Sequence, residues 1–328
     1  MHAWQCEEPT GPAGLRWVEA ATPVPGAGQA LVAIRAASLN FPDLLVVQGK
    51  YQFKPTPPFV PGAEFSGVVE ALGEGVTRLA PGQPVMSVAV TGGFATHACV
   101  PATQLVPVPT GMPFEDAAAF LMTYATAHHA LLDRAALKSG ETVLVLGAAG
   151  GVGTAAVQIA KAAGARVIAA VSTDDKAALC RSIGADDTVN YATTALRDAL
   201  KALTAGRGPD VICDPVGGDI AELAFRSIAW RGRHLVIGFA QGGIPSLPLN
   251  LPLLKGASIV GVFWGDFVRR EPQAFAAGLA ELAAWYRSGH IKPVLDRVLP
   301  MAELSEAFTR MASRRAMGKI VLINSAAD

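Results

Sequence analysis

Short apolar runs without alternation recur through the middle of the chain, and each precedes a segment of helical composition. A parallel strand covered on both faces needs such a continuous run, whereas a half-exposed strand would alternate. Repeated strand–helix units at this spacing predict an α/β fold with a doubly wound parallel sheet. The predicted strands are 143–146, 167–171, 188–191, 211–214, 234–237 and 259–262, and the helices are 152–163, a segment ending at 183, 194–204 and 220–230.

Both ends of the chain have a different texture. The first third is β-rich, with strands predicted at 30–36, 65–71 and 85–90 between proline- and glycine-rich connections. A helix is predicted over 114–134, because Pro113 precedes a long segment of helical composition. The tail is predicted to return to the first domain; its elements are a helix at 273–288, a strand at 294–299, a helix at 302–311 and a strand at 319–323.

Composition excludes several function classes. Hydrophobic residues make up 51% of the 328 residues, charged residues 16%, and the formal net charge is zero. Such a chain buries enough apolar surface to fold, and it offers no electrostatic footprint for nucleic acid or anionic lipid. The uncharged stretch 142–160 is about as long as a membrane span, but four central glycines favour a turn between two short elements.

The N-terminus lacks an apolar signal core, and the four cysteines are far apart and form no CxxC pair. We therefore expect a cytoplasmic protein without membrane partner, disulfide framework or structural zinc.

The segment LVLGAAGGVG (144–153) joins the first predicted strand of the middle region to its helix. Glycines there permit a sharp turn, close approach of a pyrophosphate to the main chain, and tight packing of helix on strand. The helix N-terminus then offers free N–H groups to the anion. The motif reads GxxGxxG, and four further strand–helix units make it a strong prediction of a dinucleotide site. Its expected contacts are Gly147, Gly150, Gly151, Val152 and Gly153.

The residues after the second strand bear on the choice of nicotinamide cofactor. NAD-binding proteins usually place an acid there, whereas Ser172 follows this strand, with Lys176 one helical turn later and Tyr191 at the end of the third strand. Hydroxyls and a cation suit a 2′-phosphate, so we favour NADPH. Asp174 and Asp175 would repel that phosphate, although both also suit the first turn of a helix. Lys176 could equally be a solvated helix residue.

Five segments together resemble the medium-chain dehydrogenase/reductase superfamily: GAAGGVG, NFPDLLVVQGKY (40–51), VPGAEFSGVV (60–69), GADDTVNY (184–191) and RRAMGKIVL (314–322). More narrowly, they resemble its zinc-free quinone oxidoreductase branch, similar to zeta-crystallin. The resemblance implies a GroES-like β-rich catalytic domain formed by residues 1–123 and 267–328. A Rossmann NADP-binding domain, residues 124–266, is inserted into it, and the resemblance also implies a homodimer.

The zinc ligands of related dehydrogenases have no counterpart here. Those enzymes carry a cysteine near the position of Asn40, and a histidine where Ala63 precedes Glu64. Zinc needs three or four N, S or O ligands within tetrahedral reach, and no histidine is spaced for that with a cysteine. The adjacent His128 and His129 point to different sides of one helix. We therefore expect no metal.

The resemblance assigns the acceptor side of the site to three residues near the N-terminus. Asn40 would line the pocket and donate an amide hydrogen bond to a carbonyl oxygen, although it could also cap a turn. Tyr51 matches a pocket tyrosine that donates a proton in enoyl-thioester reductases, although it could pack on prolines instead. Leu45 replaces a tyrosine found in some bacterial quinone reductases, which makes the pocket more apolar.

The same resemblance places further residues beside the cofactor. Thr126 would contact the nicotinamide amide, and the carboxyl ends of the later strands would flank the ring, where ligands bind in such sheets. Phe239 and Trp264 would also wall the substrate pocket, although both could be packing aromatics. The remaining predicted contacts are Val216, Gly238, Phe263 and, near the adenosine phosphate, Arg314.

These expectations describe an NADPH-dependent, zinc-independent oxidoreductase that reduces a quinone or a conjugated carbonyl compound such as an enone. Two alternatives stay open. One is reduction of an enoyl-CoA or another enoyl thioester, with Tyr51 as the acid. The other is a non-catalytic NADPH-binding protein.

Overall fold

The computed structural model describes residues 1–324 and divides into two compact units. The first unit joins Met1–Met122 to the segment that begins at Leu295, and the second comprises Thr123–Val294. The return of the chain to the first unit thus falls later than the predicted residue 267. The intervening residues stay with the second unit, because the Phe267 ring stacks on His129 at 3.9 Å and Leu282 is buried.

The first unit is built on a seven-stranded sheet with the order β14-β15-β3-β4-β5-β7, in which β6 also pairs with β3. β15 runs antiparallel to β3, so the predicted strand 319–323 pairs within the sheet of the first unit. A separate antiparallel pair is formed by β1 and β2. The bounds are β1 His2–Cys6, β2 Leu15–Glu19, β3 Gln29–Leu39, β4 Glu64–Leu72, β5 Pro84–Val88, β6 His97–Pro101, β7 Leu105–Pro107, β14 Leu295–Pro300 and β15 Lys319–Ile323.

Few helices accompany this sheet, namely α1 Phe41–Val47, α2 Phe114–Ala118 and α11 Leu304–Ala312. The predicted helix 114–134 is not one regular helix. After α2 the chain passes through the π-helical segments Leu121–Ala125 and His129–Arg134, with α3 (Thr126–His128) between them. Ala119, with φ near −108°, ends α2, and the boundary between the two units follows directly.

The second unit contains the predicted doubly wound sheet. Its six strands are all parallel and lie in the order β10-β9-β8-β11-β12-β13, so the order reverses between β8 and β11. In such sheets a ligand binds outside the carboxyl ends at the point of reversal. The bounds are β8 Thr142–Leu146, β9 Arg166–Val171, β10 Asp187–Asn190, β11 Val211–Asp214, β12 Arg233–Val236 and β13 Ser258–Gly261.

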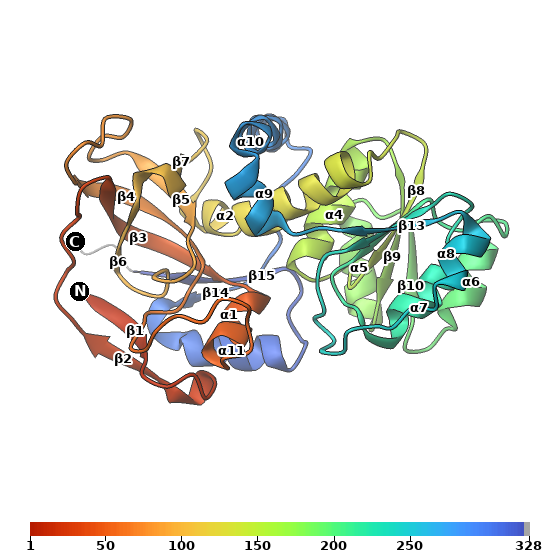
Figure 1. Cartoon of the computed structure of the whole chain (residues 1–328), viewed down its shortest axis with the longest axis horizontal. Helices are drawn as coiled ribbons and strands as arrows, with labels where there is room; N and C mark the ends of the chain where they lie inside the picture. The colour runs from red at the N-terminus through yellow and green to blue at the C-terminus, as the bar shows by residue number, and fades with distance from the viewer. Residues whose placement is uncertain (325–328) are drawn as a thin grey trace. The chain divides into compact units, whose positions relative to one another are not determined.

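Helices cover this sheet (Figure 1), and its central strand is buried on both faces. Leu144 and Leu146 share one core with the helices that follow β10 and β11. Val143 and Val145 point to the other face and are also fully buried. This double burial explains why the strands read as uninterrupted apolar runs. The helices are α4 Gly151–Ala162, α5 Asp174–Ser182, α6 Leu196–Leu203 and α7 Gly218–Arg226.

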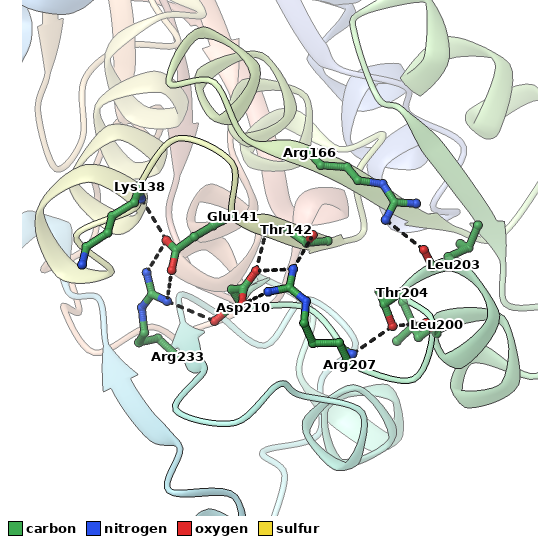
Figure 2. A network of polar contacts seen from close by, with 11 residues as sticks. Lys138, Glu141, Thr142, Arg166, Leu200, Leu203, Thr204, Arg207, Asp210 and Arg233 are labelled. Atoms are coloured by element: carbon green, nitrogen blue, oxygen red, sulfur yellow. Dashed lines mark hydrogen bonds and ion pairs between the residues drawn. The ribbon is translucent and has the colours of Figure 1, made fainter.

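The charged side chains at the amino ends of these strands bind one another. Glu141 accepts hydrogen bonds of 2.8 and 2.7 Å from Arg233, and Asp210 accepts one of 2.8 Å from the Thr142 N–H (Figure 2). Burial alone would raise the pKa of Glu141, but the hydrogen bonds from Arg233 and Lys138 lower it below its usual value. This network braces the end of the sheet opposite the glycine turn.

Two helices were not predicted. α8 (Asn250–Lys255) and α9 (Trp264–Arg270) lie in segments for which no helix was predicted, whereas α10 (Pro272–Arg287) corresponds to the predicted helix 273–288. α8 lies in a segment rich in proline and glycine, and its Leu253 and Leu254 side chains are exposed. The sequence therefore has no amphipathic pattern that would predict this helix. Within residues 1–324, no helix combines the length and apolarity that a membrane crossing requires.

Candidate functional site

The glycine turn connects β8 to α4 and is shaped by close backbone contacts. Gly147 has a φ of 57°, a conformation that favours glycine. A Cβ atom on Gly153 would lie 2.3 Å from the carbonyl oxygen of Gly147 and 2.7 Å from backbone atoms of Ala148. A side chain at Gly153 would require a shift of the main chain, and one at Gly147 would be strained by the positive φ and would meet the Val216 side chain at 2.7 Å. Both glycines are therefore explained by the turn itself.

Gly150 is a different case, because the fold does not require a glycine there. Its φ is −81°, and an added Cβ would meet only the Gly147 oxygen, at 3.4 Å. Gly150 is the N-cap of α4, and Gly151, Val152 and Gly153 follow in the first turn, whose N–H groups have no partner within a helix. The missing side chain leaves room over a helix N-terminus, where an anion is stabilised. This cradle fits the pyrophosphate of a dinucleotide.

The predicted 2′-phosphate residues come together after β9. The Lys176 ammonium lies 3.4 Å from the Ser172 hydroxyl, and Thr173 caps α5 by accepting a hydrogen bond from the Lys176 N–H. Asp174, at the first position of α5, accepts a hydrogen bond of 2.9 Å from Asn190, so its carboxylate has a partner of its own. Tyr191, which follows β10, packs partly buried on the sheet core.

Two loops at the carboxyl ends of β11 and β12 are joined by hydrogen bonds. The Asp214 carboxylate accepts the N–H groups of Val216 and Gly217, both at 2.8 Å. Its backbone oxygen accepts the Ile237 N–H at 3.0 Å. Phe239 lies against the same turn, because a Cβ on Gly217 would be 2.7 Å from the ring. These contacts hold Val216, Gly238 and Phe239 at the carboxyl edge of the sheet. Val216 also lies next to the glycine turn, because a Cβ atom added to Gly147 would be 2.7 Å from its side chain.

The remaining predicted cofactor residues of this unit differ in exposure. Thr126 is buried at the start of α3, and Phe263 is 63% exposed just after β13. Trp264 is 8% exposed and meets Phe275 of α10 edge to face at 5.9 Å. This contact accounts for the burial of Trp264 by packing within the second unit.

In the first unit, Asn40 is part of a buried polar network. Its side-chain nitrogen donates to the Ser38 carbonyl at 3.2 Å and to the Glu64 carboxylate at 3.1 Å, and its oxygen accepts from Lys319. Glu64 also accepts from Lys319 at 3.1 Å and from the Ser38 hydroxyl at 2.8 Å. Asn40, Glu64 and Lys319 are at most 5% exposed. Both amide hydrogens of Asn40 therefore have partners inside the protein.

Asp43 and Tyr51 form the other polar feature of this region. The Asp43 carboxylate accepts the N–H groups of Asn40 at 2.8 Å and Ala63 at 2.9 Å. Burial raises the pKa of Asp43 to about 7, against the lowering effect of these bonds and of the Lys319 charge. Burial and the Asp43 charge also raise the pKa of the half-buried Tyr51, so its phenol keeps its proton at neutral pH. Leu45 is half-buried on α1.

Arg314 lies in the first unit, in the turn between α11 and β15. It is exposed and has a φ of 56°, which is uncommon for a residue with a side chain. Such conformations cost free energy and recur at functional sites.

Among the residues that the structure describes, no three histidine, cysteine, aspartate or glutamate side chains are grouped in a way that could hold a metal ion. Asn40 and Ala63 occupy the positions at which the resemblance would place zinc ligands.

The structure thus groups the predicted residues into two sets, one in each unit. The second unit brings together the glycine turn, the Ser172–Lys176 pair and the loops that carry Val216 and Phe239. The first unit holds Asn40, Leu45, Tyr51 and Arg314. Lys319 was not among the predicted site residues, because nothing in the segment RRAMGKIVL around it indicates that a lysine there is buried. Asp214 was not assigned a role either.

Comparisons with known proteins agree with this arrangement. Residues 26–110 match the family model described as the alcohol dehydrogenase GroES-like domain, and residues 151–284 match the one described as zinc-binding dehydrogenase. The chain is 38% identical over 300 residues to the quinone oxidoreductase-like protein 2 homolog of Nematostella vectensis, covering 90% of this chain and 82% of the relative.

Solved structures also resemble the chain over nearly its full length. The quinone oxidoreductase of Thermus thermophilus, solved alone and with NADPH, has a TM-score of 0.86 and 35% identity, covering 99% of this chain and 100% of that one. The mycobacterial protein Rv1454c, solved with NADPH, has a TM-score of 0.92 and 33% identity, with the same coverage.

Proposed function

Because the chain belongs to the quinone oxidoreductase branch of the medium-chain dehydrogenase/reductase superfamily, we propose that it reduces a quinone or another conjugated carbonyl compound with NADPH. The observation that carries the proposal is the cradle at Gly150, where the fold leaves room over the N-terminus of α4 without needing it for packing. When bound, the cofactor supplies a hydride from its nicotinamide ring.

The residues of the second unit would bind and orient that cofactor. The first turn of α4 receives the pyrophosphate, with Gly147, Gly151, Val152 and Gly153 forming its walls. Ser172, Lys176 and Tyr191 are the proposed contacts of the adenosine ribose and its phosphate. Thr126, Val216, Gly238, Phe239, Phe263 and Trp264 are the proposed contacts of the nicotinamide end.

In the first unit, Tyr51 is the proposed hydrogen-bond donor to the acceptor oxygen. Its pKa is raised, so the phenol retains the proton that it would donate. The Asn40 amide is engaged with Ser38 and Glu64, so in this proposal it supports the pocket and contacts the acceptor only by exchanging one of those bonds. Leu45 contributes apolar surface against a flat ring.

Replacing Tyr51 with phenylalanine distinguishes the two candidate reactions. A quinone needs little electrophilic help, so we expect turnover with quinones to fall less than about tenfold, the loss of one hydrogen bond. An enoyl thioester needs a proton donor, and its reduction would fall by about 10²–10⁴-fold. Steady-state kinetics with both substrate classes measure this, with Tyr286→Phe on α10 as a control. A loss of the larger size with quinones would contradict the proposal that solvent can supply the proton that completes quinone reduction when Tyr51 is absent.

Replacing Lys176 with alanine tests the choice of cofactor. We expect the KM for NADPH to rise about tenfold and the KM for NADH to change little, because only NADPH carries the 2′-phosphate. The exposed Lys201 of α6 offers a matched Lys→Ala control. Equal effects on both cofactors would show that Lys176 does not contact that phosphate.

We also propose that the reaction proceeds without zinc, because Asn40 and Ala63 replace the expected ligands. Metal analysis of purified, active protein tests this proposal, and stoichiometric zinc that activity requires would refute it. A cytoplasmic location is proposed as well. It is supported by Cys6, Cys99, Cys180 and Cys213, all of which are unpaired.

A homodimer is the proposed assembly. β13 is an edge strand, and Ile259 on it is 43% exposed. Leu249, Leu253 and Leu254 nearby in sequence are 70–81% exposed. Open strand edges and exposed apolar side chains are typical of surfaces that bind a second copy. We expect light scattering to give twice the 33.9 kDa chain mass, and Ile259→Lys to give a monomer. A monomeric wild-type protein would refute the assembly.

A further inference from the structure

His234 lies in the middle of the second unit and belongs to none of the site motifs. It is the second residue of β12 and is 1% exposed. Its Nε2 atom lies 3.0 Å from Oδ2 of Asp214, and its ring is 5.7 Å from that of Phe225 on α7. Among the described residues, its Nδ1 atom has no hydrogen-bond partner. The one polar contact of this buried ring is therefore directed at Asp214.

Both oxygens of the Asp214 carboxylate have hydrogen-bond partners. Oδ1 accepts the N–H groups of Val216 and Gly217, while Oδ2 faces His234. A carboxylate only accepts, so the proton of the pair is on Nε2. This donor fixes the orientation of the carboxylate. The carboxylate in turn holds the following turn, in which Gly217 has a φ of 65° and Gly218 a φ of 62°.

The turn also forms hydrogen bonds with the loop that follows β12. The Ala240 N–H donates to Pro215 at 3.1 Å, the Gln241 N–H donates to Val216 at 2.9 Å, and the Gly218 N–H donates to Gly243 at 3.0 Å. The two loops at the carboxyl ends of β11 and β12 are therefore connected by three main-chain hydrogen bonds. They carry Val216 and Phe239, which the proposed function places beside the nicotinamide.

We propose that His234 is a positioning residue for the dinucleotide site: through Asp214 it sets the turn of Val216 and Gly217 and the loop of Phe239. The inference rests on the proposed NADPH site. Because His234 is 1% exposed, its role in this proposal is to set the geometry of the site through Asp214 and not to contact the cofactor.

The test compares His234→Leu, which removes the donor, with His234→Gln, whose side-chain amide can still donate to Asp214. For His234→Leu we expect the dissociation constant for NADPH, measured by fluorescence titration, to rise about tenfold, the size of one lost hydrogen bond to a charged group. Turnover at saturating NADPH should change less than about threefold, because the binding surface is displaced but no reacting group is lost. His234→Gln should recover most of the affinity.

A second readout needs no cofactor. In the unliganded protein, hydrogen–deuterium exchange of the segment containing the Val216 and Gly217 amides should become faster in His234→Leu and stay close to wild type in His234→Gln. The exposed His290 provides a matched His→Leu control, for which we expect neither effect.

The outcomes separate this inference from the proposed function. A wild-type protein that binds no NADPH would overturn the proposed function and the cofactor role of His234 together. Normal NADPH affinity and normal exchange in His234→Leu would overturn the inference alone. If His234→Leu does not fold, the test uses His234→Gln, which keeps a donor to Asp214. NADPH binding as weak in His234→Gln as in Asp214→Ala would show that the hydrogen bond from residue 234 to Asp214 does not determine the affinity, and it would overturn the inference.

Discussion

Gly153→Ala is expected to destabilise the second unit and to abolish NADPH binding. The added methyl group would lie 2.3 Å from the Gly147 oxygen and 2.7 Å from Ala148 backbone atoms, and backbone cannot yield as a flexible side chain can. Overpacking of this kind costs about 1–3 kcal/mol. Urea denaturation measures the free energy of unfolding, and fluorescence titration measures NADPH binding.

Gly150→Ala is the matched comparison, since it adds the same methyl group three residues earlier in the same turn. Here the added atom meets nothing closer than 3.4 Å and φ is −81°, so stability should stay within about 0.5 kcal/mol. The methyl group would nevertheless occupy the room over the helix N-terminus, and we expect NADPH binding to weaken about tenfold or more. Normal NADPH affinity in Gly150→Ala would contradict the assignment of the cradle.

Replacing Lys319 with methionine should destabilise the first unit by about 3–5 kcal/mol. The Glu64 carboxylate is fully buried, and Lys319 is the cation that faces it, at 3.1 Å. Without Lys319 the carboxylate keeps its bonds from Ser38, Asn40 and the Met122 N–H, but its charge is no longer compensated. Urea denaturation of both proteins measures the difference.

A double variant shows whether charge is the cause. Glu64→Gln removes the buried charge, so Glu64→Gln with Lys319→Met should be more stable than Lys319→Met alone. The exposed Lys54 gives a control, and Lys54→Met should change the free energy of unfolding by less than about 0.5 kcal/mol. A loss below about 1 kcal/mol in Lys319→Met would show that the pair does not compensate a buried charge.

The parallel sheet could be predicted from the sequence because its strands carry no polar face. Residues 211–214 were predicted with the bounds that the structure has, and the other strands of the second unit differ by one residue at one or both ends. The strand 319–323 of the first unit was also predicted with its observed bounds. The region after Phe114 could not be predicted, because its composition suits any helix and gives no sign of the change to π-helical bonding. β1 and β2 gave no signal comparable to an apolar run.

The candidate site was predictable where its residues act through local backbone geometry. Turn glycines and a cap such as Thr173 act through local backbone geometry, which sequence spacing reveals. The contacts of Asn40 with Glu64 and Lys319 span 24 and 279 residues, so no local pattern could show that its amide is already engaged. His234 likewise reads as one polar residue in a strand until its distance to Asp214 is known.

Trp264 has a packing contact in addition to the pocket role that the resemblance assigns to it. The motif predicted a wall of the acceptor pocket, and the structure shows the ring packed on Phe275 in the second unit. Phe239, held against the Gly217 turn, and the exposed Phe263 are better placed to meet a ligand from solvent.

The central claim, reduction of a quinone with NADPH, is tested most directly by following NADPH oxidation by the purified protein with a simple quinone as acceptor. The account predicts saturable, quinone-dependent consumption of NADPH that is faster than that of NADH and is reduced in Gly150→Ala. A protein that binds NADPH but does not oxidise it with any quinone or enone would contradict the account.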